Sequence, residues 1–197
     1  MKGLKTLKNV NMQESHILEF STEVVRETGS FHTAVVLSAI QELVKSADGK
    51  ITTEDIADFL KYDSAQPASV RRKLHVLECL GYIKYTKGTR YVKPIIEVLK
   101  RVEPDTDLDI RWMYQRRVSL QVCWMLSNLY NSGEILTTTE IKDLCDGLFE
   151  GQAASVMLSR LKKDGLVFHD PYCSKKDKRA GTWELSAEAI ELYEDGI

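Results

Sequence analysis

Two basic segments hold the residues whose types and spacing could do chemistry in this 197-residue chain. Residues 64–93 carry seven Lys and Arg side chains against one Glu, a balance of +6, and residues 152–185 carry seven against four acidic residues, a balance of +3. The net charge of the whole chain is −2, so the remainder carries −11. Positive charge gathered in two places on an otherwise acidic protein predicts one surface that faces a polyanion and an acidic surface behind it.

Side chains arranged for catalysis or metal binding do not stand out in the sequence. It contains no glycine-rich phosphate loop, no nucleophile elbow and no acidic pair in a recognisable catalytic frame. His169, Asp170 and Cys173 lie close together, but no fourth ligand or paired spacing accompanies them. We therefore expect a protein that is not an enzyme and that binds neither metal nor cofactor.

The composition is that of an ordinary globular protein, with 43% hydrophobic and 28% charged residues. No apolar run approaches the roughly 20 residues needed to span a bilayer, and the first residues lack the apolar region of a signal peptide. The four cysteines show no pairing pattern, which favours reduced thiols. These features predict a cytoplasmic protein without a membrane partner, associated with the nucleoid if it is prokaryotic or viral.

A block of sequence occurs twice, as residues 50–93 (the first copy) and 134–185 (the second copy). The shared positions fall at a nearly constant offset, which changes by one residue in a turn, where length varies at little cost. Two copies of one small module serve binding more readily than catalysis. The offset is 85 residues for Thr52, Thr53, Ile56 and Asp58, which match Thr137, Thr138, Ile141 and Asp143, and 84 for Leu74, Leu77 and Gly81, which match Leu158, Leu161 and Gly165.

Helices are expected to position the basic residues of the first copy. Ser30 is an expected N-cap for a helix over 31–47, and Thr52 or Thr53 caps the next helix. A third helix is expected to begin near Pro67, since proline is well placed in a first helical turn. Its spacing turns Val70, Leu74, Leu77 and Leu80 inward and leaves Arg71, Arg72 and Lys73 on outer faces.

Hairpins and further helices complete the expected fold. Residues 82–93 alternate and are broken at Lys87-Gly88, which predicts a β-hairpin with a basic tip. Helices are also predicted over 14–28, over a linker that opens at Pro94, and over 108–130. The second copy adds a helix over 152–164 and a hairpin over 166–185, and a capped helix closes the chain. The expected fold class is mainly α with small β-hairpins.

The stretch over 108–130 carries more apolar residues than one narrow stripe needs. One interpretation is that it is the first helix of a second module and packs on its own domain. The excess, with Trp112 and Met113 upstream, could instead pack two modules together or form a dimer interface. A homodimer therefore remains an alternative, and it would imply a palindromic target.

The order helix, short strand, helix, turn, helix and hairpin, twice over, resembles the winged helix-turn-helix family. The resemblance is carried by TTEDIADFL and TTTEIKDLC in the second helices, by SVRRKLHVLECLGYI in a third helix, and by the hairpin KYTKGTRYVK. It implies tandem winged-helix domains. The predicted divisions are a helical extension over 1–29, domain 1 over 30–93, a linker helix and loop over 94–107, and domain 2 over 108–197.

The resemblance also implies a DNA-binding surface, because in members of the family that bind DNA the third helix enters the major groove and the hairpin, or wing, follows the backbone or minor groove. Carried onto this chain, it implies contacts from residues of both third helices and both wings. In the first copy these are Ser64, Gln66, Ser69, Arg71, Arg72, Lys73, Lys84, Lys87, Thr89 and Arg90. In the second they are Gln152, Ser155, Ser159, Arg160, Lys162, Lys163, Lys175, Lys176, Lys178 and Arg179.

The two copies differ in where the charge lies. Arg71 and Arg72 come early in the first third helix, where base edges are usually contacted, whereas the second has Met157 and Leu158 there. We therefore expect the first copy to recognise bases and the second to hold the backbone. The predicted function is sequence-specific binding of double-stranded DNA by a transcriptional regulator. A replication-initiator-like protein and a winged-helix protein–protein adaptor are the alternatives.

Overall fold

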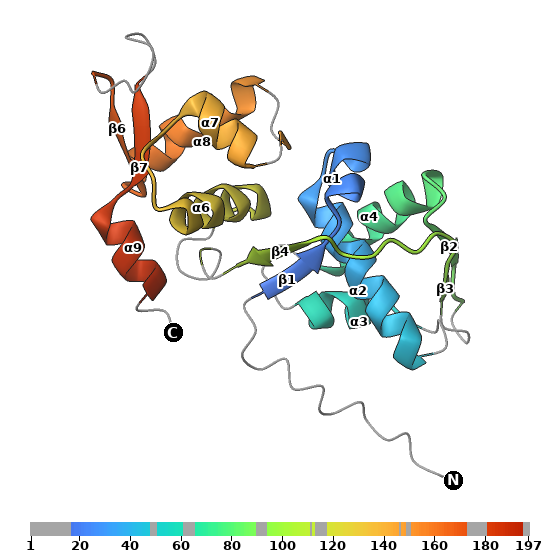
Figure 1. The fold of residues 1–197 in the computed structure, drawn as a ribbon. Coiled ribbons are helices and arrows are strands. Elements are labelled where there is room, and N and C mark those ends of the chain that lie inside the picture. Colours follow the sequence, from blue (N-terminus) through green and yellow to red (C-terminus); the bar gives the residue numbers. More distant parts are fainter. Residues whose placement is uncertain are drawn as a thin grey trace.

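The computed structural model describes residues 17–47, 51–60, 66–89, 94–110, 112, 118–145, 147–148, 151–172 and 181–194. Over these residues the protein combines helices with small antiparallel sheets. Figure 1 shows the elements from β1 to β4 on one side of the molecule and those from α6 to α9 on the other. We call these groups the first half and the second half.

The first half begins with strand β1 (Ile17–Phe20) and helices α1 (Thr22–Thr28) and α2 (Phe31–Ala47). Helices α3 (Thr53–Leu60) and α4 (Pro67–Cys79) follow. The expected cap of α2 is present, since the hydroxyl of Ser30 accepts from the N–H of Thr33 at 3.2 Å. The helices therefore lie close to where the sequence predicts them, and Gly29 is the C-cap of α1.

The predicted linker helix after Pro94 is wrong. The chain forms strand β3 (Ile95–Val98) there, antiparallel to β2 (Ile83–Thr86), with Ile83 opposite Val98. The hairpin therefore spans 83–98 and extends beyond the predicted domain boundary at 93. Ile96 is buried while its neighbours on either side are exposed, the alternation of a half-buried strand. Proline is tolerated at the start of a strand as well as at the start of a helix. Pro94 therefore could not show which of the two follows it.

Two other predicted helices differ from expectation, because residues at their starts form a second small sheet. Strand β1 pairs antiparallel with β4 (Thr106–Asp109), with Leu18 opposite Leu108 and both side chains buried. The helix predicted over 14–28 therefore begins only at Thr22. The start of the one predicted over 108–130 belongs instead to β4, and α6 (Leu120–Ser132) forms its later part. Sequence periodicity missed this sheet because its strands are four residues long and distant in sequence.

The second half contains helices α6 (Leu120–Ser132), α7 (Thr138–Leu144), α8 (Gly151–Lys163) and α9 (Ala187–Glu194). Its sheet has the order β5-β7-β6, formed by β5 (Leu136–Thr137), β6 (Val167–Asp170) and β7 (Thr182–Leu185). The predicted second hairpin is therefore present. Ser186 caps α9 by accepting from the N–H of Ala189 at 3.1 Å.

The matched sequence positions of the two halves form matched local structures. The hydroxyl of Thr52 accepts from the N–H of Asp55, whose carboxylate accepts from the N–H of Thr52, and Thr137 and Glu140 repeat this reciprocal cap. Gly81 and Gly165 follow α4 and α8 with φ of 75° and 74°. One backbone hydrogen bond of 2.9 Å closes each turn: Tyr82 to Leu77 and Leu166 to Leu161.

An aromatic cluster joins the halves. The ring centroids of Phe20 and Trp124 are 5.6 Å apart in an edge-to-face arrangement, and those of Phe31 and Trp124 are 6.2 Å apart. All three side chains are buried. The apolar surface of α6 thus packs the two halves together, and α6 also contacts α7 and β7 of its own half. These are two of the three arrangements that the sequence left open. In addition, the amide of Gln41 on α2 exchanges two 2.8 Å hydrogen bonds with the backbone of Val102, which fixes the connecting segment.

Candidate nucleic-acid interface

Helix α4 presents an outward face opposite its buried stripe. Val70, Leu74 and Leu77 are fully buried, whereas Arg71 and Arg72 are exposed. Because a helix turns by about 100° per residue, Arg72 lies almost diametrically opposite the stripe and Arg71 lies on its flank. Of the three basic residues expected on this surface, Arg72 is therefore best placed to enter a groove.

Lys73, the third basic residue expected on this surface, is less exposed than the two arginines. It is half-buried, and its Nζ lies 3.5 Å from the hydroxyl of Ser30, at the start of α2. Burial, followed by the nearby charge of Arg72, lowers the pKa of Lys73. Its charge is directed towards the beginning of α2, beside the outward face of α4.

The charge of Lys73 also affects the protonation of His32. Burial, and then the charges of Lys73 and Arg72, lower the pKa of His32 to about 4. The imidazole is consequently neutral at physiological pH. The positive potential around it therefore comes from Arg72 and Lys73, which makes this corner of the first half suited to an anion.

An acidic side chain lies on the other flank of α4. The pKa of Glu54, at the start of α3, is lowered by its own backbone N–H, by the hydroxyl of Thr53 and, in smaller part, by the charge of Arg71. Arg71 is therefore close enough to Glu54 to feel its charge. This neighbour reduces the positive potential at Arg71 and leaves Arg72 as the dominant cation of the outward face.

The other expected contacts of the first half lie around α4 and its hairpin. Gln66, at the N-cap of α4, is exposed, and Ser69 is half-buried. Lys84 is exposed on β2 opposite Glu97, and Lys87 and Thr89 are exposed after β2. Ser64 and Arg90 lie outside the described residues.

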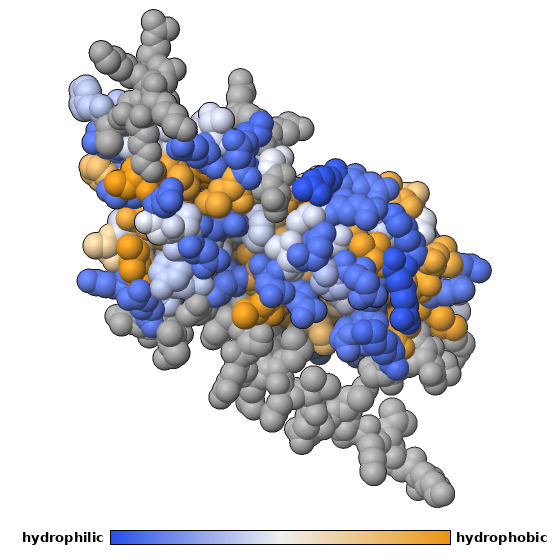
Figure 2. All heavy atoms as spheres, in the orientation of Figure 1, coloured by the Kyte–Doolittle hydropathy of each residue, from blue (hydrophilic) through white to orange (hydrophobic). Residues whose placement is uncertain are grey.

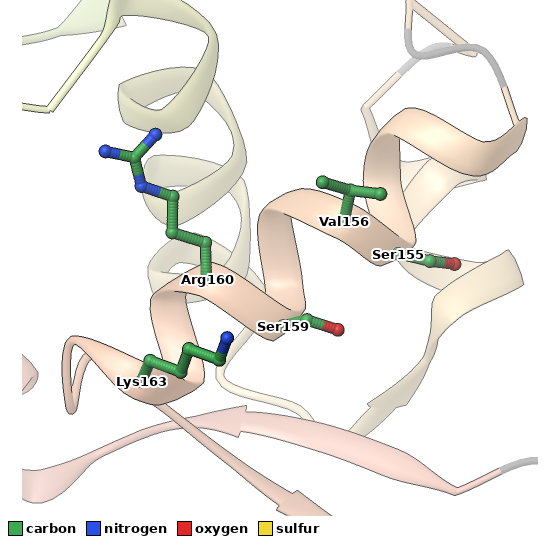
Figure 3. A pocket seen from close by; sticks show the side chains of 5 residues that line it. All are labelled: Ser155, Val156, Ser159, Arg160 and Lys163. Carbon is green, nitrogen blue, oxygen red and sulfur yellow. The ribbon is translucent and has the colours of Figure 1, made fainter.

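Helix α8 has an equivalent outward face, hollowed by a shallow depression of about 430 Å³. Figure 3 shows the side chains that line it, all from α8: Ser155, Val156, Ser159, Arg160 and Lys163. Four of these are predicted contacts, and all five are exposed. Ala154, Leu158 and Leu161 form the buried stripe on the opposite side of the helix. The structure therefore brings the predicted residues of α8 onto one surface.

Comparison with known proteins adds little to this geometry. No protein-family model and no curated protein matches the chain. Among solved structures, ScpB from Mycobacterium tuberculosis is similar. The two chains are 15% identical, and the alignment covers 83% of this chain and 98% of that one, with a TM-score of 0.28. A similarity this low supports no functional conclusion for this chain, whose candidate surface is defined by its own local geometry.

The second hairpin is packed tightly at its base. The ring centroids of His169 and Trp183 are 4.0 Å apart, and the indole N–H of Trp183 donates to the hydroxyl of Thr138 at 2.9 Å. Burial and then the charge of Lys162 lower the pKa of His169, while Asp170 opposes the shift. Lys162 is therefore near enough to the second hairpin to influence His169, and it is not among the residues that line the depression.

Several expected contacts of the second half cannot be placed. Lys175, Lys176, Lys178 and Arg179 lie outside the described residues, and the side chain of Gln152 does as well. Cys173, the third residue considered for a metal site, is also outside them. The described residues bring no three His, Cys, Asp or Glu side chains together for a metal ion. No helix in the described ranges has both the length and the apolar character needed to cross a membrane.

Sequence reasoning missed some residues on the two outward faces. Val156 is 67% exposed and lines the α8 depression, and Val76 and Cys79 are exposed on α4. Helical spacing from the buried leucines would have located them, but apolar side chains were assigned to the core. In Figure 2 the apolar surface on the side shown is divided into separate areas among hydrophilic side chains.

Proposed function

We propose that the protein binds double-stranded DNA in a sequence-specific manner through tandem winged-helix units and acts as a transcriptional regulator. The observation that carries this proposal is the matched construction of α4 and α8. Each follows a helix with a reciprocal Thr–acid cap, ends in a left-handed glycine and leads into a hairpin. Each also exposes cations opposite a buried apolar stripe.

The charge of these faces supports nucleic acid as the partner. Phosphates attract Lys and Arg side chains regardless of base sequence, whereas an arginine in the major groove can bind the O6 and N7 atoms of guanine with two hydrogen bonds. Arg72 is exposed and lies opposite the core of its helix, as such a contact requires. Arg160 and Lys163 on α8 supply the same kind of charge to the second half.

The direct test is selection of bound sequences from a random DNA pool, followed by affinity measurements on the enriched site at several salt concentrations. We expect one enriched motif. If about seven basic groups meet phosphates, the log–log salt slope should be about −6. No enrichment together with weak, salt-insensitive binding would overturn the proposal and favour a protein-binding adaptor.

A pair of variants tests the assigned surface. Arg72→Ala should weaken binding to the selected site by about 10-fold and relax its sequence preference, because a bidentate base contact contributes roughly 1–3 kcal/mol. Lys45→Ala is the matched control, since Lys45 is an exposed cation on α2 that pairs with Glu42 at 2.7 Å. Equal effects of both variants would mean that general charge, and not α4, determines binding.

A further inference from the structure

The outward face of α8 includes an exposed apolar side chain, which a surface used only to hold phosphates does not need. Val156 is 67% exposed, and among the exposed large hydrophobic residues of the described chain only Tyr172, at 94%, exceeds it. Val156 and Ser155 line the depression nearer the start of α8, and Ser159, Arg160 and Lys163 line it further along the helix (Figure 3). Ser155 and Ser159 are small, so a partner can approach the valine methyl groups closely.

Val156 occupies the position that Arg72 has in the first half. The buried leucines of α4 and α8 are related by an offset of 84 residues, and the same offset relates Arg72 to Val156. The match of the two arginines with Met157 and Leu158 expected from the sequence is therefore wrong, and Leu158 is buried. Arg72 and Val156 therefore lie opposite the core of their helices. At this position α4 has a side chain that can donate two hydrogen bonds, whereas α8 has a side chain with two methyl groups.

The chemistry around Val156 identifies its partner group. Arg160 and Lys163, about one and two turns further along α8, add positive charge to the same face, which favours a polyanion over an uncharged or basic protein surface. In the major groove the single apolar group on a base edge is the C5-methyl of thymine, which contacts apolar side chains. We propose that Val156 contacts a thymine methyl group in the DNA site, so that α8 contributes to base recognition.

This inference rests on the proposed function. It also revises the expectation from the charge distribution that the second copy holds the backbone. The two halves would then recognise different bases at equivalent helix positions, guanine through Arg72 and thymine through Val156. A chain with unlike helices reads an asymmetric site.

The test uses the full-length protein and its selected DNA site, with each thymine replaced in turn by deoxyuridine, which lacks only the methyl group. The wild-type protein should lose about fourfold in affinity at one position, the effect of one buried methyl-sized group. Val156→Ala should bind the unmodified site about fourfold more weakly and be insensitive to that replacement. Leu99→Ala, which changes a 55% exposed residue outside α8, should keep the wild-type sensitivity.

Val156→Ala is expected to fold normally, since the side chain is exposed and alanine favours a helix. If DNA binds but no replacement matters, or if Val156→Ala retains the sensitivity, the thymine contact is overturned while DNA binding stands. The depression would then be a candidate for a protein partner. If the chain enriches no DNA site, the proposed function and this inference both fail.

Discussion

Asp105 holds Thr22 through both carboxylate oxygens. Oδ1 accepts from the backbone N–H of Thr22 and Oδ2 from its hydroxyl, each at 2.8 Å, across 83 residues of sequence. Thr22 is the first residue of α1, whose N-cap residue, Ser21, makes no side-chain capping bond. Asp105, which lies near the end of the first half in sequence, therefore caps helix α1 near its beginning.

Removing this contact should destabilise the first half. Burial raises the pKa of Asp105, but the hydrogen bonds from Thr22 and Thr106 outweigh it, and the net pKa is lowered. Asp105→Ala should lower the unfolding free energy by about 1 kcal/mol at pH 7, the usual cost of a lost cap. Urea denaturation would measure this, and Asp107→Ala on the exposed side of β4 is the control.

The same contact has a defined pH dependence. A carboxyl with a lowered pKa in the folded state stabilises the fold above its unfolded pKa, about 3.9, and this stabilisation is lost as the pH falls through the folded pKa. The difference between wild type and Asp105→Ala should therefore shrink in acid. A constant difference from pH 7 to pH 3 would contradict the assigned ionic character.

His32 should make stability depend on pH in a different range. Its pKa is about 4 when folded, because of burial and of Lys73 and Arg72, against about 6.5 when unfolded. The unfolded state thus binds the proton first, so stability should be complete above pH 6.5 and fall as the pH drops towards 4. Denaturation midpoints of wild type and His32→Asn would show this, with a smaller slope in the variant. Lys73→Met should raise the pKa of His32 in an NMR titration.

Gly181 should tolerate no side chain. An added Cβ would lie 2.5 Å from Nε2 of His169 and 2.9 Å from the carbonyl oxygen of Asp170 and the Cα of Pro171. Gly181→Ala should therefore destabilise the second hairpin by roughly 1–3 kcal/mol, the range for overpacking, in thermal or chemical unfolding. Adding His169→Ala should not restore stability, since the other two contacts are with the backbone. Full rescue would show that the imidazole alone limits the site.

The aromatic cluster should transmit destabilisation between the halves. Phe20→Ala removes a fully buried ring that contacts Trp124 on α6, and should cost about 3–5 kcal/mol. Hydrogen exchange should then become faster in α6 as well as in β1 and α2. Loss of protection confined to residues 17–110 would show that the halves fold independently. Val156→Ala, an exposed apolar truncation, should leave exchange unchanged.

Local signals in the sequence predicted much of this fold. Ser30, Gly29 and Gly81 mark helix ends by their own conformational preferences, and the repeated Thr–acid caps could be recognised from four residues. The β1–β4 sheet could not be recognised from the sequence. Ile17–Phe20 alternates over too few residues, and its partner strand lies about 90 positions away. Its strands are stabilised by tertiary contacts that no local window contains.

The candidate site was predicted at the level of elements and less well at the level of side chains. The outward exposure of Arg71 and Arg72 followed from helical spacing, whereas Ser159 and Arg160 were expected from the family resemblance. The half-burial of Lys73 could not be predicted, because its long side chain reaches back to Ser30, which depends on how α2 packs beside α4. Val156 was overlooked because hydropathy assigns valine to a core.

The pairing of β1 with β4 also sets the order of events during synthesis. Phe20 and Leu18 leave the ribosome early, but the strand that covers them is not made until residue 109 has been added. Until then a nascent chain exposes these apolar side chains and an unpaired strand edge. For the same reason, a fragment cut at the boundary suggested by the repeat, after residue 93, would lack both β3 and β4. The first half is complete only once the connection to the second has been built.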